Sequence, residues 1–183
     1  MKLISERIYL RPLQEEDAAV LTEHNCKNRE YFQAFTPTRD DDYYTKEFQL
    51  DLIRRSEQDM QEDKQYPFGI FLQESDKLIG SISLFQVERR FLQRAMIGYS
   101  IDRDYEGKGY MTEAVRLLVD FGFRELRLHR IWAEAKPSNL GSICVLEKAG
   151  FEREGIARKN VQINGRWEDH MVLAILNPKE ELN

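Results

Sequence analysis

The residues with the clearest potential for chemistry form a glycine-containing stretch, residues 105–113, with the sequence YEGKGYMTE. A strand-like run, residues 95–101, precedes it, and a helical pattern follows it with apolar residues on one side: Met111, Val115, Leu118 and Phe121. Glycine allows the backbone to approach a ligand closely because it has no Cβ. The first N–H groups of a helix lack partners and carry the positive end of its dipole, so they suit a phosphate. The stretch therefore predicts an anion cradle, and the alternative is an ordinary strand-to-helix turn.

The composition is that of a globular protein with a sizeable core. Of the 183 residues, 42% are hydrophobic and 32% are charged, and no apolar run approaches the roughly 20 residues that cross a bilayer. Charge occurs too early in the first residues for a secretory signal peptide. Cys26 and Cys144 have no metal-ligand spacing, which indicates reduced thiols in the cytoplasm. Because the net charge is −5, a general nucleic-acid binder is disfavoured. We expect one cytoplasmic domain, residues 1–183, without a metal, nucleic acid or membrane partner.

Hydrophobic periodicity and turn residues predict the elements that must position the glycine stretch. Strands are expected at residues 7–11, 66–72, 77–85, 91–101 and 129–135, from 151 to the hairpin turn Asn164-Gly165, and at 167–176. Helices are expected at residues 13–27, 40–64, 112–124 and 142–149, the second capped by the aspartates 40–42 and the last ended by Gly150. Gly80 is expected at a bulge or a close approach of two backbones. This order predicts an α+β fold, a mixed sheet with helices on both faces.

An aromatic-rich, irregular segment lies between the first two expected helices, at residues 28–42. It contains Tyr31, Phe32, Phe35 and Pro37. The segment is interpreted either as a loop that packs its own aromatic side chains or as one wall of a substrate pocket. An open groove at this place favours a peptide substrate, and a lidded pocket favours a small metabolite.

A second motif begins at Asn139, which stands 30 positions after Gly109, and reads NLGSICVLEKAGF to Phe151. Asn-x-x-Ser followed by Val-Leu-Glu-Lys-x-Gly-Phe resembles the second signature of the GCN5-related N-acetyltransferase (GNAT) superfamily. Residues 152–155 and 164–170 are similar to its branch of ribosomal-protein-alanine N-acetyltransferases, the RimJ/RimL-like proteins. The resemblance covers about residues 7–176. It implies a central, mixed, mostly antiparallel sheet of about seven strands, and transfer of an acetyl group from acetyl-CoA to an amine.

The resemblance also implies where acetyl-CoA binds. The glycine stretch would hold the pyrophosphate through backbone amides, and the contacts that carry over are Gly107, Lys108, Gly109, Tyr110, Met111 and Thr112. The strand ending at Tyr99 and Ile101 would splay from its neighbour and pair its backbone with the pantetheine arm. Asn139 would hold that arm through its side-chain amide, and the alternative for Asn139 is a helix cap. Glu106 departs from the common Arg or Gln, and its carboxylate disfavours a nearby pyrophosphate unless it points outward.

Two residues are candidates for catalysis, and each also has a structural interpretation. In the branch that the sequence resembles, a serine at the position of Ser142 is the proposed partner of the departing thiolate, because its hydroxyl can donate one hydrogen bond. Its alternative is an ordinary first-turn helix residue. The tyrosine acid of many superfamily members is absent, since Leu146 occupies that place. Glu88 is the candidate base, expected near the acceptor cleft, and its alternative is a surface turn. Cys144 is interpreted as a small core residue.

Three functions remain open on these residues. The first is an N-acetyltransferase that acts on the N-terminal amine of a protein, a ribosomal one in the branch resembled, by direct attack in a ternary complex. An α-amine with a pKa near 8 is already partly neutral, so a water relay could replace a base. The second is acetylation of a small amine, such as an amino acid, a polyamine or an antibiotic. The third is a non-catalytic acyl-CoA-binding module. A monomer or a homodimer is expected.

Overall fold

The computed structural model describes residues 1–178, and these residues contain one eight-stranded sheet. The strand order is β1-β2-β3-β4-β5-β6-β8-β7, and every neighbouring pair is antiparallel except β5 and β6. The strands are β1 Leu3–Ile4, β2 Ile8–Arg11, β3 Tyr66–Leu72, β4 Leu78–Glu88, β5 Arg94–Ile101, β6 Arg130–Ala135, β7 Glu152–Ile163 and β8 Arg166–Leu176. The mixed, mostly antiparallel sheet is confirmed. The additional strand is β1, a two-residue strand that pairs with β2.

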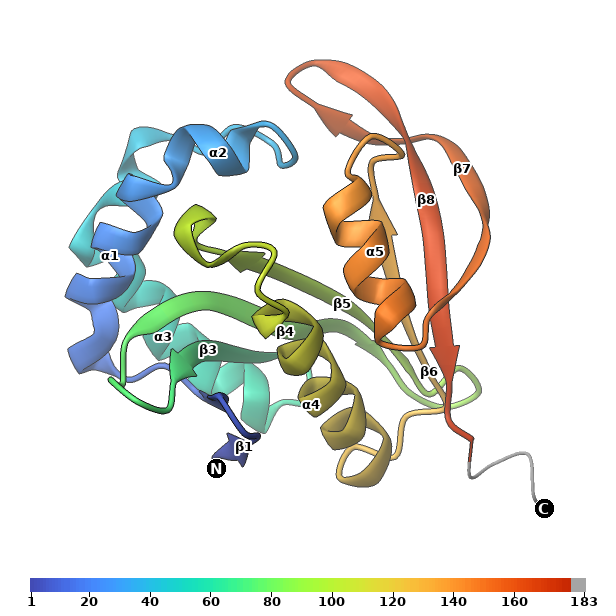
Figure 1. Ribbon diagram of the computed structural model, residues 1–183, viewed down its shortest axis with the longest axis horizontal. Helices are drawn as coiled ribbons and strands as arrows, with labels where there is room; N and C mark the ends of the chain where they lie inside the picture. The colour runs from blue at the N-terminus through green and yellow to red at the C-terminus, as the bar shows by residue number, and fades with distance from the viewer. Residues whose placement is uncertain (179–183) are drawn as a thin grey trace.

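Helices cover both faces of this sheet, as predicted (Figure 1). The helices are α1 Ala18–Lys27, α2 Arg29–Gln33, α3 Lys46–Gln61, α4 Tyr110–Arg124 and α5 Leu140–Lys148, with short 3-10 turns η1 Glu15–Asp17, η2 Asp41–Tyr44 and η3 Arg103–Tyr105. Because successive side chains of a strand point to opposite faces, β2 serves two cores. Ile8 and Leu10 join the core under α4 and α5, while Tyr9 joins a second core with Leu21 of α1 and Ile53 of α3.

The central feature of the sheet is a divergence between β5 and β6. These two parallel strands pair only over Arg94–Met96 and Arg130–Trp132. Residues 97–101 of β5 therefore pair with β4 alone among the described residues, and their other edge is open. This is the splay that the family resemblance implies. On the β4 side the backbones lie very close, because a Cβ on Gly80 would come within 2.4 Å of the Ser100 carbonyl oxygen. The predicted close approach at Gly80 is confirmed.

The predicted turn chemistry is confirmed at two places and wrong at a third. Asn164 and Gly165 have φ values of 49° and 81°, as a two-residue hairpin turn between β7 and β8 requires. Gly150 has a φ of 100° and follows α5, so it ends that helix as predicted. The predicted helix from Asp40 was wrong, since η2 is a separate turn and α3 begins only after Thr45. The hydroxyl of Thr45 caps α3 by accepting from the Phe48 N–H.

Other boundaries shift without changing the fold. The first helix starts at Ala18 after η1, and the segment of residues 28–42 contains the short helix α2 where an irregular loop was expected. Strand β4 extends to Glu88 and β5 begins at Arg94, so the turn between them lies at residues 89–93, later in the chain than the predicted residues 86–90. Among residues 1–178, no helix combines the length and the apolar character needed to span a bilayer.

Candidate active site

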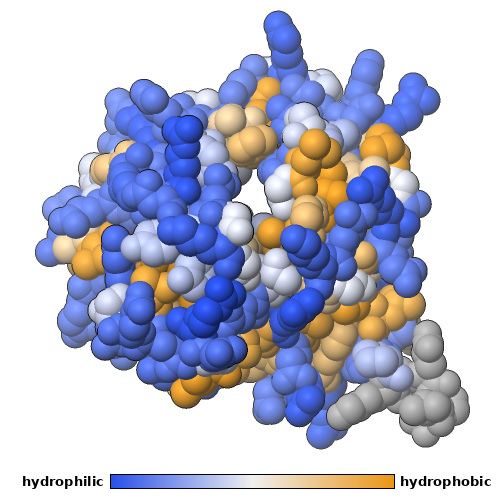
Figure 2. Space-filling model, viewed as in Figure 1, coloured by the Kyte–Doolittle hydropathy of each residue, from blue (hydrophilic) through white to orange (hydrophobic). Residues whose placement is uncertain are grey.

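A cavity of about 680 Å³ lies where β5 leaves β6. Its lining comes from the glycine stretch, from β3, β4 and the open half of β5, from α5, and from the segment from α1 to α3. Figure 2 shows the molecule hollowed between the α2 region and the α5 region. The divergence of two parallel strands thus creates a space that a continuous sheet would fill with backbone.

The glycine stretch has the geometry of an anion cradle. Gly107 and Gly109 have φ values of 68° and 83°, in the left-handed region that glycine tolerates. A Cβ on Gly107 would meet no atom within 4 Å, so backbone conformation and not space selects glycine there. Among residues 1–178, the N–H groups of residues 107–109 have no acceptor, and helix geometry leaves those of Tyr110, Met111 and Thr112 without one. Six consecutive amide donors at the start of a 15-residue helix fit a pyrophosphate.

The side chain of Met111 explains why a large residue is tolerated in this stretch. It is 5% exposed and packs in the core beneath α4. A bulky side chain at this position is therefore accommodated by the core.

Arg7, in the turn between β1 and β2, holds the cradle, a role that sequence reasoning missed. Its Nη1 donates to the Lys108 carbonyl oxygen at 2.9 Å, and its guanidinium lies 4.7 Å from the Tyr110 ring centroid. Its Nε donates to Glu113 at 3.0 Å. Burial acts to raise the pKa of Glu113, but hydrogen bonds from Ser5 and Arg7 outweigh it and hold that pKa below its usual value. No sequence signal joins Arg7 to a residue more than 100 positions away.

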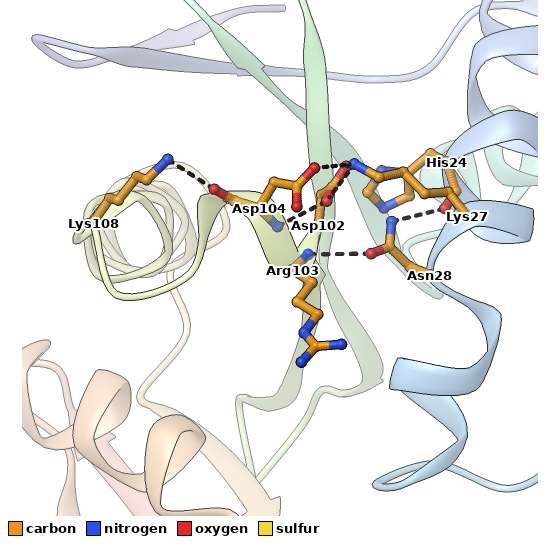
Figure 3. Close-up of polar contacts among 7 residues, drawn as sticks. All are labelled: His24, Lys27, Asn28, Asp102, Arg103, Asp104 and Lys108. Carbon is orange, nitrogen blue, oxygen red and sulfur yellow. Dashed lines mark hydrogen bonds and ion pairs between the residues drawn. The ribbon is translucent and has the colours of Figure 1, made fainter.

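A second set of contacts fixes the base of the cradle (Figure 3). Lys27, at the end of α1, donates to both carboxylate oxygens of the buried Asp102 at 3.0 and 2.8 Å, and to Asp104 at 2.5 Å. The side-chain oxygen of Asn28 accepts from the Arg103 N–H at 3.1 Å. Burial acts to raise the pKa of Asp102, but the bonds from Lys27 and the Asp104 N–H hold it below its usual value. The end of α1 therefore anchors η3, and η3 leads directly into the cradle.

The Glu106 side chain lines the cavity and contacts α2. The Tyr31 hydroxyl of α2 donates a hydrogen bond to its carboxylate. Burial first, and then this bond to Glu106, raise the pKa of Tyr31 to about 12. The carboxylate is therefore bound to the opposite wall of the cavity, and it links the cradle to the aromatic segment.

Asn139 and Ser142 meet at the start of α5. Asn139 caps the helix, because its side-chain oxygen accepts from the Ser142 N–H at 3.1 Å. The cap that was the alternative interpretation is present, and the amide NH₂ of Asn139 is left without a partner among residues 1–178. The Ser142 Oγ lies 2.9 Å from the hydroxyl of Tyr99, which also lies 3.2 Å from the Ser142 carbonyl oxygen. All three residues line the cavity.

The aromatic segment forms one wall of the same cavity, with lining residues Tyr31, Phe32, Phe35, Thr36 and Arg39, and Tyr43 and Tyr44 of η2 line the cavity beside it. It also packs its own rings, since Tyr31 lies 5.7 Å from Phe32 and 6.2 Å from Phe35 between ring centroids. The segment therefore packs its own rings and also lines the cavity, and its contact with a substrate stays a prediction. The wall is tied to its surroundings at both ends. Tyr31 bonds to Glu106, and Thr38 donates to Asn164 at the hairpin tip through its N–H at 3.1 Å and its hydroxyl at 2.6 Å.

Comparison with known proteins decides the family. Residues 7–152 match the family model described as an acetyltransferase (GNAT) domain, which is most of the chain. The chain belongs to the GNAT acetyltransferase family.

This GNAT chain aligns with relatives over nearly its whole length. It is 55% identical to the probable N-acetyltransferase YjcK of Bacillus subtilis (strain 168), over 98% of this chain and 99% of that protein. It is 31% identical to the [ribosomal protein uS5]-alanine N-acetyltransferase of Escherichia coli (strain K12), over 97% and 92%. The crystal structure of the ribosomal-protein-S5-alanine acetyltransferase from Vibrio fischeri superposes with a TM-score of 0.92 at 30% identity, covering 97% of both chains. Mycobacterium smegmatis RimJ in complex with CoA-disulfide gives 0.88 at 27% identity, over 96% and 83%.

The GNAT chain is thus an N-acetyltransferase, and its likeness to the RimJ/RimL-like branch, inferred from the motifs, is confirmed. Enzymes of this family use acetyl-CoA. Among residues 1–178, no group of three or more His, Cys, Asp or Glu side chains is arranged to hold a metal ion.

Two expected placements differ from the structure. Glu88 was expected near the acceptor cleft, but it pairs with Arg94 at 2.9 and 2.8 Å and does not line the cavity. The β4–β5 register explains this, because Gly80 opposes Ile101 beside the cradle while Glu88 opposes Arg94 at the other end of the ladder. Cys144 was expected in the core, but it is exposed and lines the cavity, since the buried face of α5 is formed by Ile143 and Leu146.

Proposed function

We propose that this GNAT enzyme transfers the acetyl group of acetyl-CoA to the N-terminal amine of a protein, most directly a ribosomal protein, by direct attack in a ternary complex. The observation that carries the proposal is the cavity of about 680 Å³ that the glycine stretch and the aromatic segment line together, in which the thioester of acetyl-CoA and an acceptor amine can meet. Tyr31 and Thr38 tie the aromatic segment to Glu106 and Asn164, and such a tied wall also suits a small amine, so the wall by itself does not select the acceptor. The relatives named as ribosomal-protein-alanine acetyltransferases favour a protein acceptor.

The donor side rests on the cradle and its neighbours. The amides of residues 107–112 would hold the pyrophosphate. The open edge of β5 at Tyr99 and Ile101 would pair with the pantetheine arm in the manner of an added strand. Asn139 would contribute its free amide NH₂ to the same arm. Acetyl-CoA supplies the activated acetyl group, and the protein residues orient it.

The charges of the acceptor side favour a singly charged amine over a polycation. Among the described residues that line the cavity, the charged side chains are Arg39, Glu106 and Lys148, and the one carboxylate is bonded to Tyr31. A polyamine or an aminoglycoside would bring further ammonium groups, and each would need a carboxylate partner in a partly desolvated site. Neutral polar groups such as Asn25 and Gln49, beside aromatic rings, suit a peptide backbone.

The acceptor chemistry requires no strong base. A protein α-amine has a pKa near 7.7–8.0, so a useful fraction is neutral near pH 7. Glu88 is not carried into the proposed site, because it lies outside the cavity lining. Ser142 lines the cavity at the first turn of α5 and is the proposed hydrogen-bond donor to the departing thiolate.

The test is a comparison of acceptors at fixed acetyl-CoA, with release of free thiol as the measurement. The acceptors are peptides with the N-terminal sequences of ribosomal proteins, the same peptides with a blocked N-terminus but an internal lysine, spermidine and an aminoglycoside. We expect thiol release with at least one free N-terminus, no release with its blocked counterpart, and acetylation located at the α-amine by mass spectrometry. Release with spermidine or the aminoglycoside and with no peptide would contradict the proposal.

A further inference from the structure

We propose that Tyr99 is a positioning residue, whose hydroxyl donates a hydrogen bond to the Ser142 Oγ and so leaves the single proton of Ser142 free for the departing thiolate. The inference rests on the proposed function of Ser142 and adds a second side chain to it. For Tyr99, the resemblance implied only a backbone contact with the pantetheine arm.

The distances allow two arrangements of two protons. The Tyr99 hydroxyl lies 2.9 Å from the Ser142 Oγ and 3.2 Å from the Ser142 carbonyl oxygen, and each hydroxyl has one proton. In one arrangement Tyr99 donates to the carbonyl and Ser142 donates to Tyr99, so no proton faces the cavity. In the other, Tyr99 donates to the Ser142 Oγ, and the Ser142 proton is free. A negative charge that develops on sulfur beside Ser142 favours the second arrangement.

Both partners are held in place by secondary structure. The Ser142 N–H donates to Asn139 at 3.1 Å, which fixes Ser142 in the first turn of α5. Tyr99 lies on the half of β5 that pairs with β4 and not with β6, so its ring spans the gap between the open strand and α5. Burial raises the pKa of Tyr99 to about 12, against a lowering by the Ser142 hydrogen bond. Tyr99 therefore keeps its proton near pH 7 and remains a donor.

The step leaves both hydroxyls protonated. As the amine nitrogen bonds to the acetyl carbon, the carbon–sulfur bond breaks with its electron pair on sulfur, and the surplus proton of the amine passes to water. Ser142 and Tyr99 stabilise the thiolate through a chain of two hydrogen bonds, and both side chains keep their protons. The device thus differs from general acid catalysis, in which a side chain gives up its proton.

The measurement is the thiol pKa of protein-bound CoA, followed by the ultraviolet absorbance of the thiolate as the pH is raised. We expect the wild-type protein to lower this pKa relative to free CoA. Tyr99→Phe and Ser142→Ala should each return it toward the free value, and the double variant should go no further than Ser142→Ala. Tyr99→Phe should also lower kcat by about threefold to tenfold without raising the Kd for CoA.

Tyr66→Phe is the matched control. Tyr66 has a pKa raised to about 12, by burial first and then by its hydrogen bond to Asp63, and it lies outside the cavity lining. Loss of the Tyr66 hydroxyl should leave the thiol pKa of protein-bound CoA unchanged. A Tyr99→Phe variant that binds CoA with the wild-type thiol pKa overturns the role of Tyr99, even if its activity falls. Failure of the wild-type protein to bind CoA in calorimetry overturns the proposed function itself, which separates the two results.

Discussion

Replacing Gly109 by alanine tests whether backbone conformation builds the cradle. Gly109 has a φ of 83°, and a non-glycine residue in the left-handed region costs roughly 1–2 kcal/mol. A Cβ there would lie 3.3 Å from the Nη2 of Arg7, which a flexible side chain can accommodate, so the dihedral is the main cost. If the loop of the Gly109→Ala variant relaxes to avoid this strain in the absence of ligand, binding of acetyl-CoA must restore the strained conformation. The Kd for acetyl-CoA should then rise by about fivefold to thirtyfold.

Gly165→Ala is the control with matched strain. Gly165 has a φ of 81°, and a Cβ added to it would meet no atom within 4 Å. It lies at the β7–β8 hairpin tip and not in the cradle. Gly165→Ala should lower the free energy of unfolding by roughly 1–2 kcal/mol, whereas Gly109→Ala should lower it by less, because its loop relaxes in the absence of ligand. Only Gly109→Ala should weaken acetyl-CoA binding.

Calorimetric titration with acetyl-CoA, alongside urea denaturation, separates the two effects. Ser142→Ala is the second comparison, because its hydroxyl is assigned to the thiolate and not to the pyrophosphate; its Kd should stay within about threefold of wild type. Wild-type affinity together with wild-type stability in Gly109→Ala would refute the cradle, because the strain must appear in one of the two measurements. Equal losses of affinity in Gly109→Ala and Ser142→Ala would refute the division of roles between them.

Three further predictions concern the supports of the site. Lys27→Met should lower the urea midpoint clearly more than Asp104→Asn, because it leaves the buried carboxylate of Asp102 without its cation while Asp104 is exposed. His24 is buried with its Nε2 unpartnered among residues 1–178, and burial lowers its pKa despite the opposing charge of Asp102. The pKa of His24 in the folded protein is below its unfolded value near 6.5, so the free energy of unfolding should be highest above pH 6.5 and fall as the pH drops below it. His24→Phe should reduce this loss of stability at low pH, as measured by urea titrations at several pH values. Glu106→Gln removes a negative charge beside the cradle and should change the acetyl-CoA Kd by no more than about threefold in calorimetry, because an exposed charge is screened.

Local patterns were enough to predict the parts of the site that one stretch of chain makes by itself. The two glycines of residues 105–113 require positive φ, and Asn139 with Ser142 forms a cap within one turn. The turn at Asn164 works in the same way. In each case, the interacting atoms are close in sequence, so residue type and spacing carry the geometry.

Placement along the sheet was harder to predict, and Glu88 shows why. It stands in a strand that does run past the cavity, but the register of β4 on β5 carries it to the end that opposes Arg94. Register depends on how many residues the connecting turn absorbs. The predicted strand ended at residue 85, whereas β4 continues to residue 88.

The sequence by itself therefore determined the cradle, the cap of α5, the hairpin and the alternation that gives the sheet two covered faces. The tertiary structure decided which distant side chains meet: Arg7 with Glu113, Lys27 with Asp102, Tyr31 with Glu106, Thr38 with Asn164 and Tyr99 with Ser142. These partners are 43 to 126 positions apart. Contacts at such separations arise only when helices and strands pack against a common core, because no local preference of either residue specifies the other.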